Sequence, residues 1–295
     1  MAMYPPQTLT QEEQKTICDY AIRIGKALKI KGLMNIQYVI YKGRVYIIEV
    51  NPRASRTIPI ISKVTGVQMV NIATRIMTGK KLSDFGLKTG LLKAPDYFSI
   101  KAPVFSFDKL RLVETSLGPE MKSTAEVLGL GFYKVNALYK AVTSSGINIP
   151  DSGNLLMSIA NKEKEECLGI ASRLAALGFK LYGTEETYKY LRGHGVNIEL
   201  AHTPGEGSPD VLDMMKENHI NMVFNTPTKG KNPGKLGFRI RRLAVELRIP
   251  CITSIDTCLS VITVLENRRK GVDLRAYSLN EFIEKFDDRT IIEIK

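Results

Sequence analysis

The apolar positions in the first part of the chain predict a helix followed by a hairpin. Across residues 10–31 they recur at helical spacing, and Thr10 with Glu13 has the signature of a capping box at the helix start. Two apolar runs follow at residues 34–40 and 45–50, and the four residues between them have the length and composition of a hairpin turn. We therefore expect a helix that packs on a core, beside two paired strands.

The pattern weakens after the hairpin. Residues 62–77 read as helical, residues 97–107 alternate enough for one or two strands, and residues 136–142 end another helical pattern. These segments predict a mixed α+β region.

Periodicity vanishes in TSSGINIPDSG at residues 143–153, where Ser, Gly, Pro and Asp concentrate as they do in interdomain connections. The length of 295 residues is enough for two ordinary domains. We therefore expect one domain at residues 1–142, a linker at 143–153 and a second domain at 154–295.

Strands and helices alternate strictly in the second half of the chain. The strands are expected at residues 154–160, 180–182, 198–201, 222–225 and 251–254, and the helices at residues 162–177, 185–194, 209–217, 235–247 and 257–268. Such alternation is typical of an α/β domain, a doubly wound parallel sheet with helices on both faces. Ligands of these sheets bind at the carboxyl ends of the strands.

Composition narrows the class of protein. The chain is 44% hydrophobic and 24% charged, and no apolar run approaches the ~18 residues that span a bilayer, so we expect a soluble protein without a membrane segment. The first residues lack the pattern of a secretory signal, which favours the cytoplasm. The four cysteines, Cys18, Cys167, Cys251 and Cys258, form no C-x-x-C pair, so we expect them to be reduced.

The formal net charge of +12 is compatible with nucleic acid, an anionic small molecule or an acidic partner surface. The charge alone does not choose among them. The basic residues are spread thinly except in KGKNPGKLGFRIRR at residues 229–242, which could be a solvated loop and helix face. This stretch has no interleaved aromatics and no recognisable nucleic-acid motif, so we do not expect nucleic-acid binding.

A cluster of polar residues stands at the end of the predicted hairpin. Gln37 and Glu49 lie on its two arms, and Asn51 shares a face with Glu49 if the strand continues. Their oxygens suit Mg²⁺, a hard cation that is shared with phosphates. Arg53 and Arg56 would supply bidentate donors to a phosphoryl or carboxylate group. The alternative is a strand-end acid that pairs with Arg53 at the surface.

The stretch IQYVIYKGRVYIIEVNPRASRT resembles the end of an ATP-grasp synthetase core, and most closely the second core of the carbamoyl-phosphate synthetase large subunit. The resemblance implies that Gln37, Glu49 and Asn51 bind the Mg²⁺ or Mn²⁺ that bridges the ATP phosphates. It also implies that Arg53 and Arg56 hold the anionic substrate. LGPEMKSTAEVLGLG at residues 117–131 resembles the segment that follows the core in that family.

One departure limits this resemblance. Only 36 residues precede Gln37, and they contain no glycine-rich loop of the kind with which such cores hold ATP. A complete core does not fit, so we expect a remnant that binds ATP only with the missing part and is inactive alone. The implied partners are the remainder of the large subunit and the glutamine-hydrolysing small subunit.

Several strand-end loops of the second domain carry hydroxyls, amides and lysines. They are GTEET at residues 183–187 and FNTPTKGK at residues 224–231, with Lys164 at the start of the first helix. Because the ends of parallel strands meet at one crevice, an anion site is expected there. Its candidate residues are Lys164, Thr184, Thr187, Asn225, Thr226, Thr228 and Lys229. Alternatively, the first loop is only a helix cap and the second only a flexible loop.

The second domain resembles the methylglyoxal-synthase-like fold, the allosteric domain that closes the same large subunit. The resemblance implies that Lys164, Thr184, Thr187 and Asn225 bind the phosphate and ribose of a UMP- or IMP-type effector. It also implies that Thr257, in IDTC, lies near an activator site. The chain departs from bacterial relatives in having Thr203 for a lysine, Pro227 for a threonine, and Ala102 for an acid associated with ornithine.

Three classes of function remain. The first is a part of carbamoyl-phosphate synthetase, a ligase of arginine and pyrimidine biosynthesis. The second is a separate regulatory module that senses a phosphorylated metabolite without catalysis. The third is a methylglyoxal synthase, which would need a carboxylate base in the phosphate crevice. Its candidates are Glu185, Glu186 and Asp256.

Overall fold

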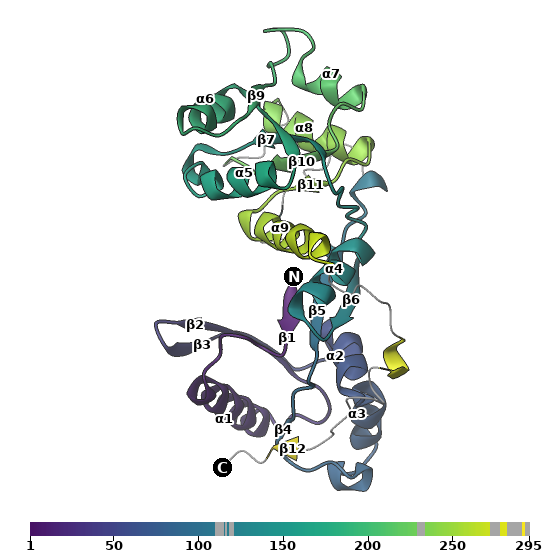
Figure 1. Cartoon of the computed structure of the whole chain (residues 1–295). Coiled ribbons are helices and arrows are strands. Elements are labelled where there is room, and N and C mark those ends of the chain that lie inside the picture. The colour runs from purple at the N-terminus through teal and green to yellow at the C-terminus, as the bar shows by residue number, and fades with distance from the viewer. Residues whose placement is uncertain are drawn as a thin grey trace. The chain divides into compact units, whose positions relative to one another are not determined.

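The computed structural model describes residues 1–109, 115, 117, 121–228, 234–271, 278–281 and 291–292 (Figure 1). The chain forms two compact units. The N-terminal unit consists of Ala2–Lys101, Leu130–Lys134 and Arg275–Lys295, and the C-terminal unit of Met1, Ala102–Gly129 and Val135–Leu274. The units are groups of residues that contact one another in space. The domain boundaries expected from the sequence stay a prediction. No helix of the described residues has both the length and the apolar character needed to cross a membrane.

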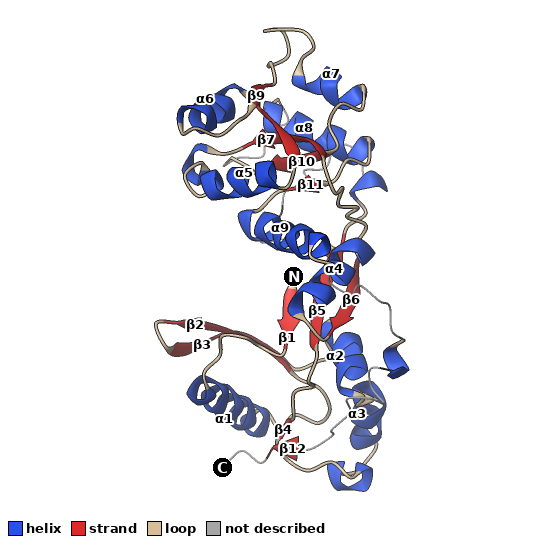
Figure 2. Cartoon of the chain, in the orientation of Figure 1, coloured by secondary structure: helices blue, strands red, loops and turns tan. Residues whose placement is uncertain are grey.

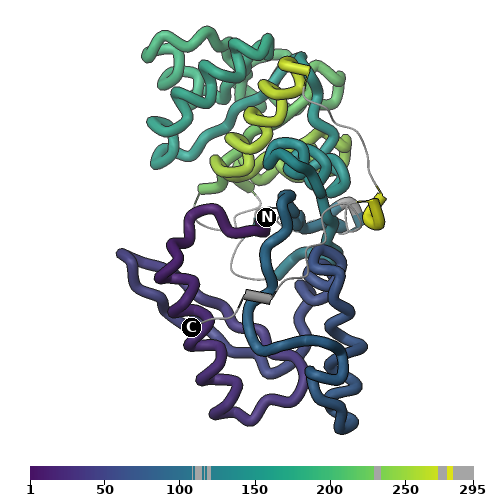
Figure 3. Tube along the Cα trace, turned by 60° about the horizontal axis from the view of Figure 1, so that its bottom comes forward, coloured from purple at the N-terminus to yellow at the C-terminus, as the bar shows by residue number. Residues whose placement is uncertain are grey.

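The predicted helix and hairpin of the N-terminal unit are confirmed. The helix α1 (Gln11–Ala27) begins with a capping box, in which Thr10 Oγ1 accepts a bond of 3.2 Å from the backbone N–H of Glu13. The strands β2 (Asn35–Tyr41) and β3 (Arg44–Asn51) pair antiparallel across a turn with positive φ at both central residues, 50° and 71°. In Figures 1 and 3 the tip of this hairpin points away from the helices that follow it in the unit.

The segment that reads as one helix over residues 62–77 forms two. The helix α2 (Thr57–Thr65) ends at Gly66, which has a φ of 67°, and α3 (Met69–Met77) begins three residues later. A left-handed glycine is the usual residue after a helix end because it carries no Cβ. The expectation of a continuous helix is therefore wrong. The short helix η1 (Leu82–Phe85) and strand β4 (Leu91–Leu92), paired with β12 (Ile291–Ile292), complete the unit.

The strands β1 (Ala2–Tyr4), β5 (Phe98–Val104) and β6 (Ala125–Gly131) form a sheet in the order β1-β5-β6. The strand expected in residues 97–107 is confirmed by β5, which is followed by the short helix η2 (Phe107–Lys109). The chain passes from one unit to the other within β5 and again within β6. The helix α4 (Lys134–Ser144) follows β6 and extends the helical pattern seen in residues 136–142.

The C-terminal unit contains a five-stranded parallel sheet in the order β11-β10-β7-β8-β9 (Figure 2). Its strands are β7 (Gly153–Ser158), β8 (Phe179–Gly183), β9 (Glu199–Leu200), β10 (Met222–Asn225) and β11 (Cys251–Ile252). Its helices are η3 (Asn161–Glu163), α5 (Cys167–Ala176), α6 (Glu185–Gly193), α7 (Val211–Lys216), α8 (Leu236–Glu246) and α9 (Ile255–Arg269). The predicted α/β class with a parallel sheet is confirmed.

The two faces of this sheet bury different helices. Leu156 and Val223 are paired neighbours on one face, where they belong to an apolar cluster with residues of α7 and α8. The adjacent residues Leu155 and Met157 point to the opposite face and are equally buried. The helices α5 and α9 contact each other, and α5 contacts β8. Burial on both faces explains why these strands are uninterrupted apolar runs.

The strand order defines a topological switch point between β7 and β10. The chain leaves β7 through α5 toward β8 on one side, and leaves β10 through α8 toward β11 on the other. Connections that diverge in this way open a crevice at the carboxyl ends of the two strands, because the helices leave opposite faces. The fold therefore places a crevice between Ser158 and Asn225, the last residues of β7 and β10.

An ion pair between Arg173 and Glu266 joins α5 to α9 through two bonds of 2.9 Å. The Arg173 guanidinium lowers the pKa of the Glu266 carboxyl from its ordinary value of 4.5. A lowered pKa stabilises the fold above the unfolded pKa, and this contribution is lost as pH falls through the folded value. We expect Glu266→Gln to lower the free energy of unfolding at pH 7, and this effect to shrink as pH falls below 4.5 and to vanish only below the folded pKa.

Urea denaturation of the chain and of Glu266→Gln at several pH values would test this expectation. Glu217→Gln is the control, since this carboxylate is 58% exposed and lies 3.8 Å from the His219 ring. A difference between the chain and Glu266→Gln that grows toward acid pH would contradict the assignment.

Candidate functional site

The polar residues at the end of the hairpin share one face of it. Gln37 of β2 is the direct cross-strand partner of Glu49 of β3, and Asn35 is the partner of Asn51. Paired residues of antiparallel strands point to the same side, and so do residues two apart along a strand. Asn51 Nδ2 donates a bond of 2.8 Å to Glu49 Oε1. The three residues expected to be metal ligands therefore lie together on one face.

A β-bulge produces this arrangement. Gln37 pairs with Glu49 while Tyr38 pairs with Ile47, so Ile48 is an extra residue on β3. With regular pairing from the turn, Gln37 would be opposite Ile48 instead. Bulges are common beside functional sites, where they redirect a side chain. Here the bulge brings the only carboxylate of the cluster beside the Gln37 amide.

The two arginines follow the hairpin in a turn. The backbone N–H of Arg53 donates to the carbonyl of Asn51 at 2.8 Å, and its Nη1 donates to the carbonyl of Ala54 at 3.0 Å. Arg56 is the N-cap residue of α2, and both side chains are exposed. Among the described residues no ion pair joins Arg53 to Glu49, so the surface pair considered as an alternative does not form.

The chemistry of these donors fits a shared magnesium ion. The bond from Asn51 leaves Glu49 Oε2 and the two amide oxygens as hard oxygen donors on one face, where Gln37 and Glu49 are exposed and Asn51 is half-buried. Mg²⁺ is commonly held by one or two carboxylates together with substrate phosphates. In the described part of the chain no three His, Cys, Asp or Glu side chains gather into a ligand set. The cluster therefore suits an ion that arrives with a phosphorylated ligand.

The switch-point crevice holds a cavity of about 190 Å³. It is lined by the loop after β7, the loop after β10 and the first turns of α8. These lining residues are Ser158, Ile159, Ala160, Asn225, Thr226, Thr228, Lys235, Gly237, Phe238 and Arg241. Three of the seven predicted anion-site residues, Asn225, Thr226 and Thr228, thus line one cavity.

Asn225 has an unusual hydrogen-bonding environment. Its side chain is almost fully buried, and its Oδ1 accepts a bond of 2.7 Å from Arg241 Nη1. Its Nδ2 is buried and has no hydrogen-bond partner among the described residues. Leaving a buried donor unsatisfied costs about 1–3 kcal/mol, so an orphan donor beside a cavity points to a ligand that accepts from it.

Two of the predicted threonines fasten the loop after β7. Thr187 Oγ1 accepts from the backbone N–H of Ile159 at 2.9 Å, and Thr226 Oγ1 accepts from that of Ala160 at 2.8 Å. Thr184, the N-cap residue of α6, donates from its hydroxyl to Thr187 at 3.4 Å. The threonines therefore hold the loop between the ends of β8 and β10.

Lys164 lies on the α6 side of this loop. It precedes α5, which begins only at Cys167, so its expected place at the helix start is wrong because residues 161–163 form the separate short helix η3. Its ammonium is buried, donates to the carbonyl of Glu186 at 2.8 Å, and lies 3.7 Å from the Glu186 carboxylate. Lys164, Thr184 and Thr187 thus gather at the start of α6. Lys229 lies outside the described residues.

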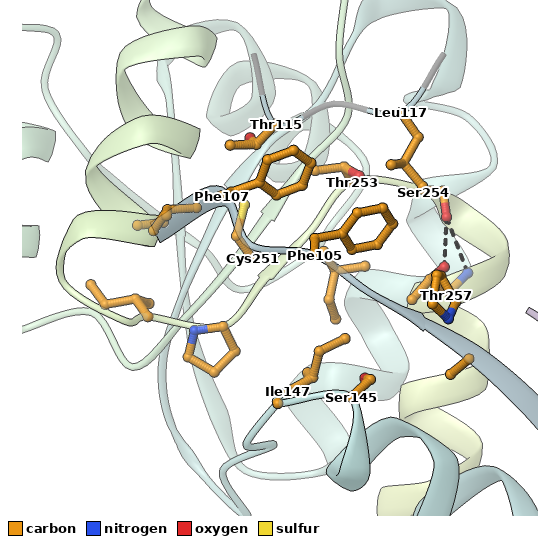
Figure 4. A pocket seen from close by; sticks show the side chains of 18 of the residues that line it. Phe105, Phe107, Thr115, Leu117, Ser145, Ile147, Cys251, Thr253, Ser254 and Thr257 are labelled. Carbon is orange, nitrogen blue, oxygen red and sulfur yellow. Dashed lines mark hydrogen bonds between the residues drawn. The ribbon is translucent and has the colours of Figure 1, made fainter. Parts of the chain in front are cut away.

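A larger cavity of about 420 Å³ lies elsewhere in the C-terminal unit and includes Thr257 (Figure 4). Ser254 caps α9 and its hydroxyl donates to Thr257 Oγ1 at 2.8 Å. The rings of Phe105 and Phe107 stack at 5.1 Å beside it. Ala102 lines the same cavity, and no acidic residue is among its described lining. The cavity is therefore mainly apolar with a hydroxyl pair at one side.

None of the three carboxylates considered as general bases is among the described residues that line the smaller cavity. Glu186 lies 3.7 Å from the Lys164 ammonium. Glu185 pairs with Lys189 at 2.7 Å, and Asp256 is exposed at the start of α9. The described lining of the smaller cavity contains no acidic residue. This geometry gives no support to proton abstraction there.

Sequence reasoning missed Arg241 as a residue of the crevice. A signal was present, since Arg241 follows Phe238 by three residues and precedes Ala244 by three, which is the spacing of the buried helix face. A charged residue at a core position of a helix needs a partner, and here Asn225 provides one. Lys235 and Gly237 also line the cavity. From the sequence they were considered only as part of the basic stretch at residues 229–242, and neither was given a role of its own.

Comparison with known proteins gives two family matches and similarities to solved structures. Residues 1–85 match the carbamoyl-phosphate synthase L chain, ATP binding domain, and residues 166–253 match the MGS-like domain. The crystal structure of methylglyoxal synthase from Elizabethkingia anophelis is similar with 15% identity and a TM-score of 0.33, over 39% of this chain and 80% of that one. The two family matches, in this order on one chain, indicate the C-terminal region of the carbamoyl-phosphate synthase large subunit, with an ATP-binding part and an MGS-like part.

Proposed function

We propose that the chain contributes metal and substrate ligands to the ATP-dependent phosphorylation of carbamate in carbamoyl-phosphate synthase, and carries its nucleotide-binding regulatory domain. The observation that carries this proposal is the order of the two family matches, ATP-binding first and MGS-like second. The reaction would supply arginine and pyrimidine biosynthesis. The remainder of the large subunit and a glutamine-hydrolysing small subunit are the partners that the role requires.

In the catalytic part, Gln37, Glu49 and Asn51 would hold Mg²⁺ or Mn²⁺ through oxygens on one face of the hairpin. Such an ion, when bound with ATP, neutralises charge on the phosphate oxygens. The exposed guanidinium groups of Arg53 and Arg56 would bind and orient the anionic substrate. These residues would supply binding and orientation.

In the regulatory part, the switch-point crevice would bind the phosphate of a UMP- or IMP-type nucleotide. The buried orphan donor of Asn225 and the hydroxyls of Thr226 and Thr228 line the cavity and are donors suited to phosphate oxygens. The Thr184 hydroxyl, which here donates to Thr187, would turn to the phosphate. Lys164, held at the start of α6 by the carbonyl of Glu186, would supply positive charge. The larger cavity with Thr257 is the place where a second, activating effector would bind.

Calorimetric titration of the chain with UMP, IMP and Mg·ATP tests whether the regulatory part binds nucleotide by itself. We expect UMP or IMP to bind and Mg·ATP not to bind without the partner part. Thr184→Ala should weaken nucleotide binding about tenfold, because one hydrogen bond to a charged group contributes about 1.5 kcal/mol or more.

Thr263→Ala is the matched control, since the Thr263 hydroxyl donates to the carbonyl of Leu259 within α9. It should bind nucleotide as the unchanged chain does. Absence of UMP and IMP binding would overturn the regulatory assignment. Nucleotide binding without any gain of synthesis on addition of the partner parts would favour a separate sensing module instead.

A further inference from the structure

The bond between Arg241 and Asn225 fixes the orientation of an amide inside the crevice. An asparagine side chain has a donor end and an acceptor end, and either could face the cavity. Arginine has only donors, so the atom 2.7 Å from Arg241 Nη1 must be the acceptor oxygen of Asn225. The Asn225 NH₂ is then the end left without a partner.

This orientation restricts what can bind at the position. A donor that is buried beside a cavity is satisfied only by an acceptor atom, such as a phosphate, carboxylate or carbonyl oxygen. The guanidinium of Arg241 is itself buried and lines the same cavity, so its positive charge favours an anionic acceptor. The N-terminus of α8 is a third favourable element, because the side chain of its N-cap residue, Lys235, makes no capping bond.

The sequence leaves room for a ligand atom at this point. A Cβ at Gly237 would lie 3.4 Å from both Arg241 Nη1 and Asn225 Nδ2. Gly237 lies one turn before Arg241 on α8 and lines the cavity. The absent side chain therefore keeps a small space open against the two nitrogen atoms.

We propose that Arg241 is the positioning residue that sets the ligand specificity of the crevice, because it holds the Asn225 amide with its NH₂ toward the ligand. The crevice then selects compounds that present a phosphate oxygen over the same compounds without phosphate. This rests on the proposed function, in which the crevice binds a phosphorylated nucleotide.

The test compares UMP with uridine, which lacks only the phosphate. Arg241→Met removes the donor to Asn225 and the charge, so we expect at least a tenfold loss of UMP affinity and less than a twofold change for uridine. Arg241→Lys keeps a donor and the charge and should restore part of the preference for UMP. A merely structural role would weaken both ligands together.

Arg242→Met is the matched control on the same helix. Arg242 is also buried, but it donates to Glu246 at 2.9 Å and to the carbonyl of Phe107 at 3.1 Å, and it does not line this cavity. It should leave the ratio of UMP to uridine affinity unchanged. An equal fall of that ratio in both variants would overturn the role of Arg241.

Two further measurements keep the test decisive if Arg241→Met folds poorly. The side-chain NH₂ resonances of Asn225, assigned by their loss in Asn225→Asp, should shift when UMP is added and not when uridine is added. Gly237→Ala should fold normally, since alanine favours helix over glycine, yet lower UMP affinity by closing the space beside Asn225. Unshifted resonances in a chain that binds UMP would refute the orientation.

The regulatory site and the role of Arg241 can be tested separately. If the unchanged chain binds neither UMP nor IMP, the proposed regulatory site falls, and the inference about Arg241 falls with it. If the chain binds UMP but Arg241→Met prefers UMP over uridine just as strongly, only the inference about Arg241 is wrong.

Discussion

Glu49→Gln is expected to reduce carbamoyl-phosphate formation at least about 10²-fold in an enzyme reconstituted from this chain, the rest of the large subunit and the small subunit. Glu49 is the only carboxylate in the cluster on the hairpin face, where it pairs with Gln37 and accepts from Asn51. The substitution keeps the shape and removes the charge. A divalent ion would then have only neutral amide oxygens from this chain, and charge on the phosphates would be less well neutralised.

The measurement is the rate of carbamoyl-phosphate synthesis at saturating substrates over a range of Mg²⁺ concentrations. We expect the residual activity of Glu49→Gln to need more Mg²⁺ than the unchanged enzyme. Glu12→Gln is the control, because this exposed carboxylate is in the first turn of α1, away from the cluster. An unchanged rate with Glu49→Gln would refute the metal assignment.

Gly129→Ala is expected to destabilise the C-terminal unit by about 3 kcal/mol. A Cβ at Gly129, on β6, would lie 2.1 Å from the carbonyl oxygen of Ala137 and 2.5 Å from the backbone nitrogen of Ala141. Both atoms belong to the backbone of α4, which cannot move aside as a flexible side chain can. The strand and the helix would have to separate, and the buried side chains of α4 would lose contacts.

Gly169→Ala is the opposite case on α5. A Cβ there meets nothing within 4 Å, and alanine is a better helix former than glycine by about 1 kcal/mol, so this variant should be more stable than the chain. Urea denaturation of both variants gives the two changes in the free energy of unfolding. Equal stability of Gly129→Ala and the unchanged chain would mean that β6 and α4 are not in close contact.

The parts of the fold that local pattern determines could be predicted from the sequence. The capping box of Thr10 and Glu13, the hairpin turn, and the five alternating strands and helices each depend on residues close together in the chain. The candidate metal cluster was found in the same way, because a two-residue spacing on one strand and one hairpin are local features.

The features that could not be predicted depend on contacts between distant segments or on the conformation of a single residue. The bond from Arg241 to Asn225 joins a helix to a strand end. The helical spacing of Arg241 indicates that it is buried, but not that Asn225 is its partner. Gly66 divides one helical pattern into two helices only because its backbone is left-handed there. The strand β6, with the sequence AEVLGLG, contains two glycines, which weaken the strand pattern. Its extended conformation depends on pairing with β5 in the sheet.

The extra residue at Ile48 has a consequence for the alignment of related chains. If the pairs are counted from the turn, regular pairing places Ile48 opposite Gln37. If they are counted from the pair of Asn35 and Asn51, regular pairing places Glu49 opposite Gln37. A related hairpin without the bulge is one residue shorter on this strand. If the two sequences are aligned from the turn, the carboxylate of that relative falls at the position of Ile48, and a gap follows it. Comparison of the ligand cluster across relatives should therefore start from the Asn51 end of the strand, where the spacing between ligands stays constant.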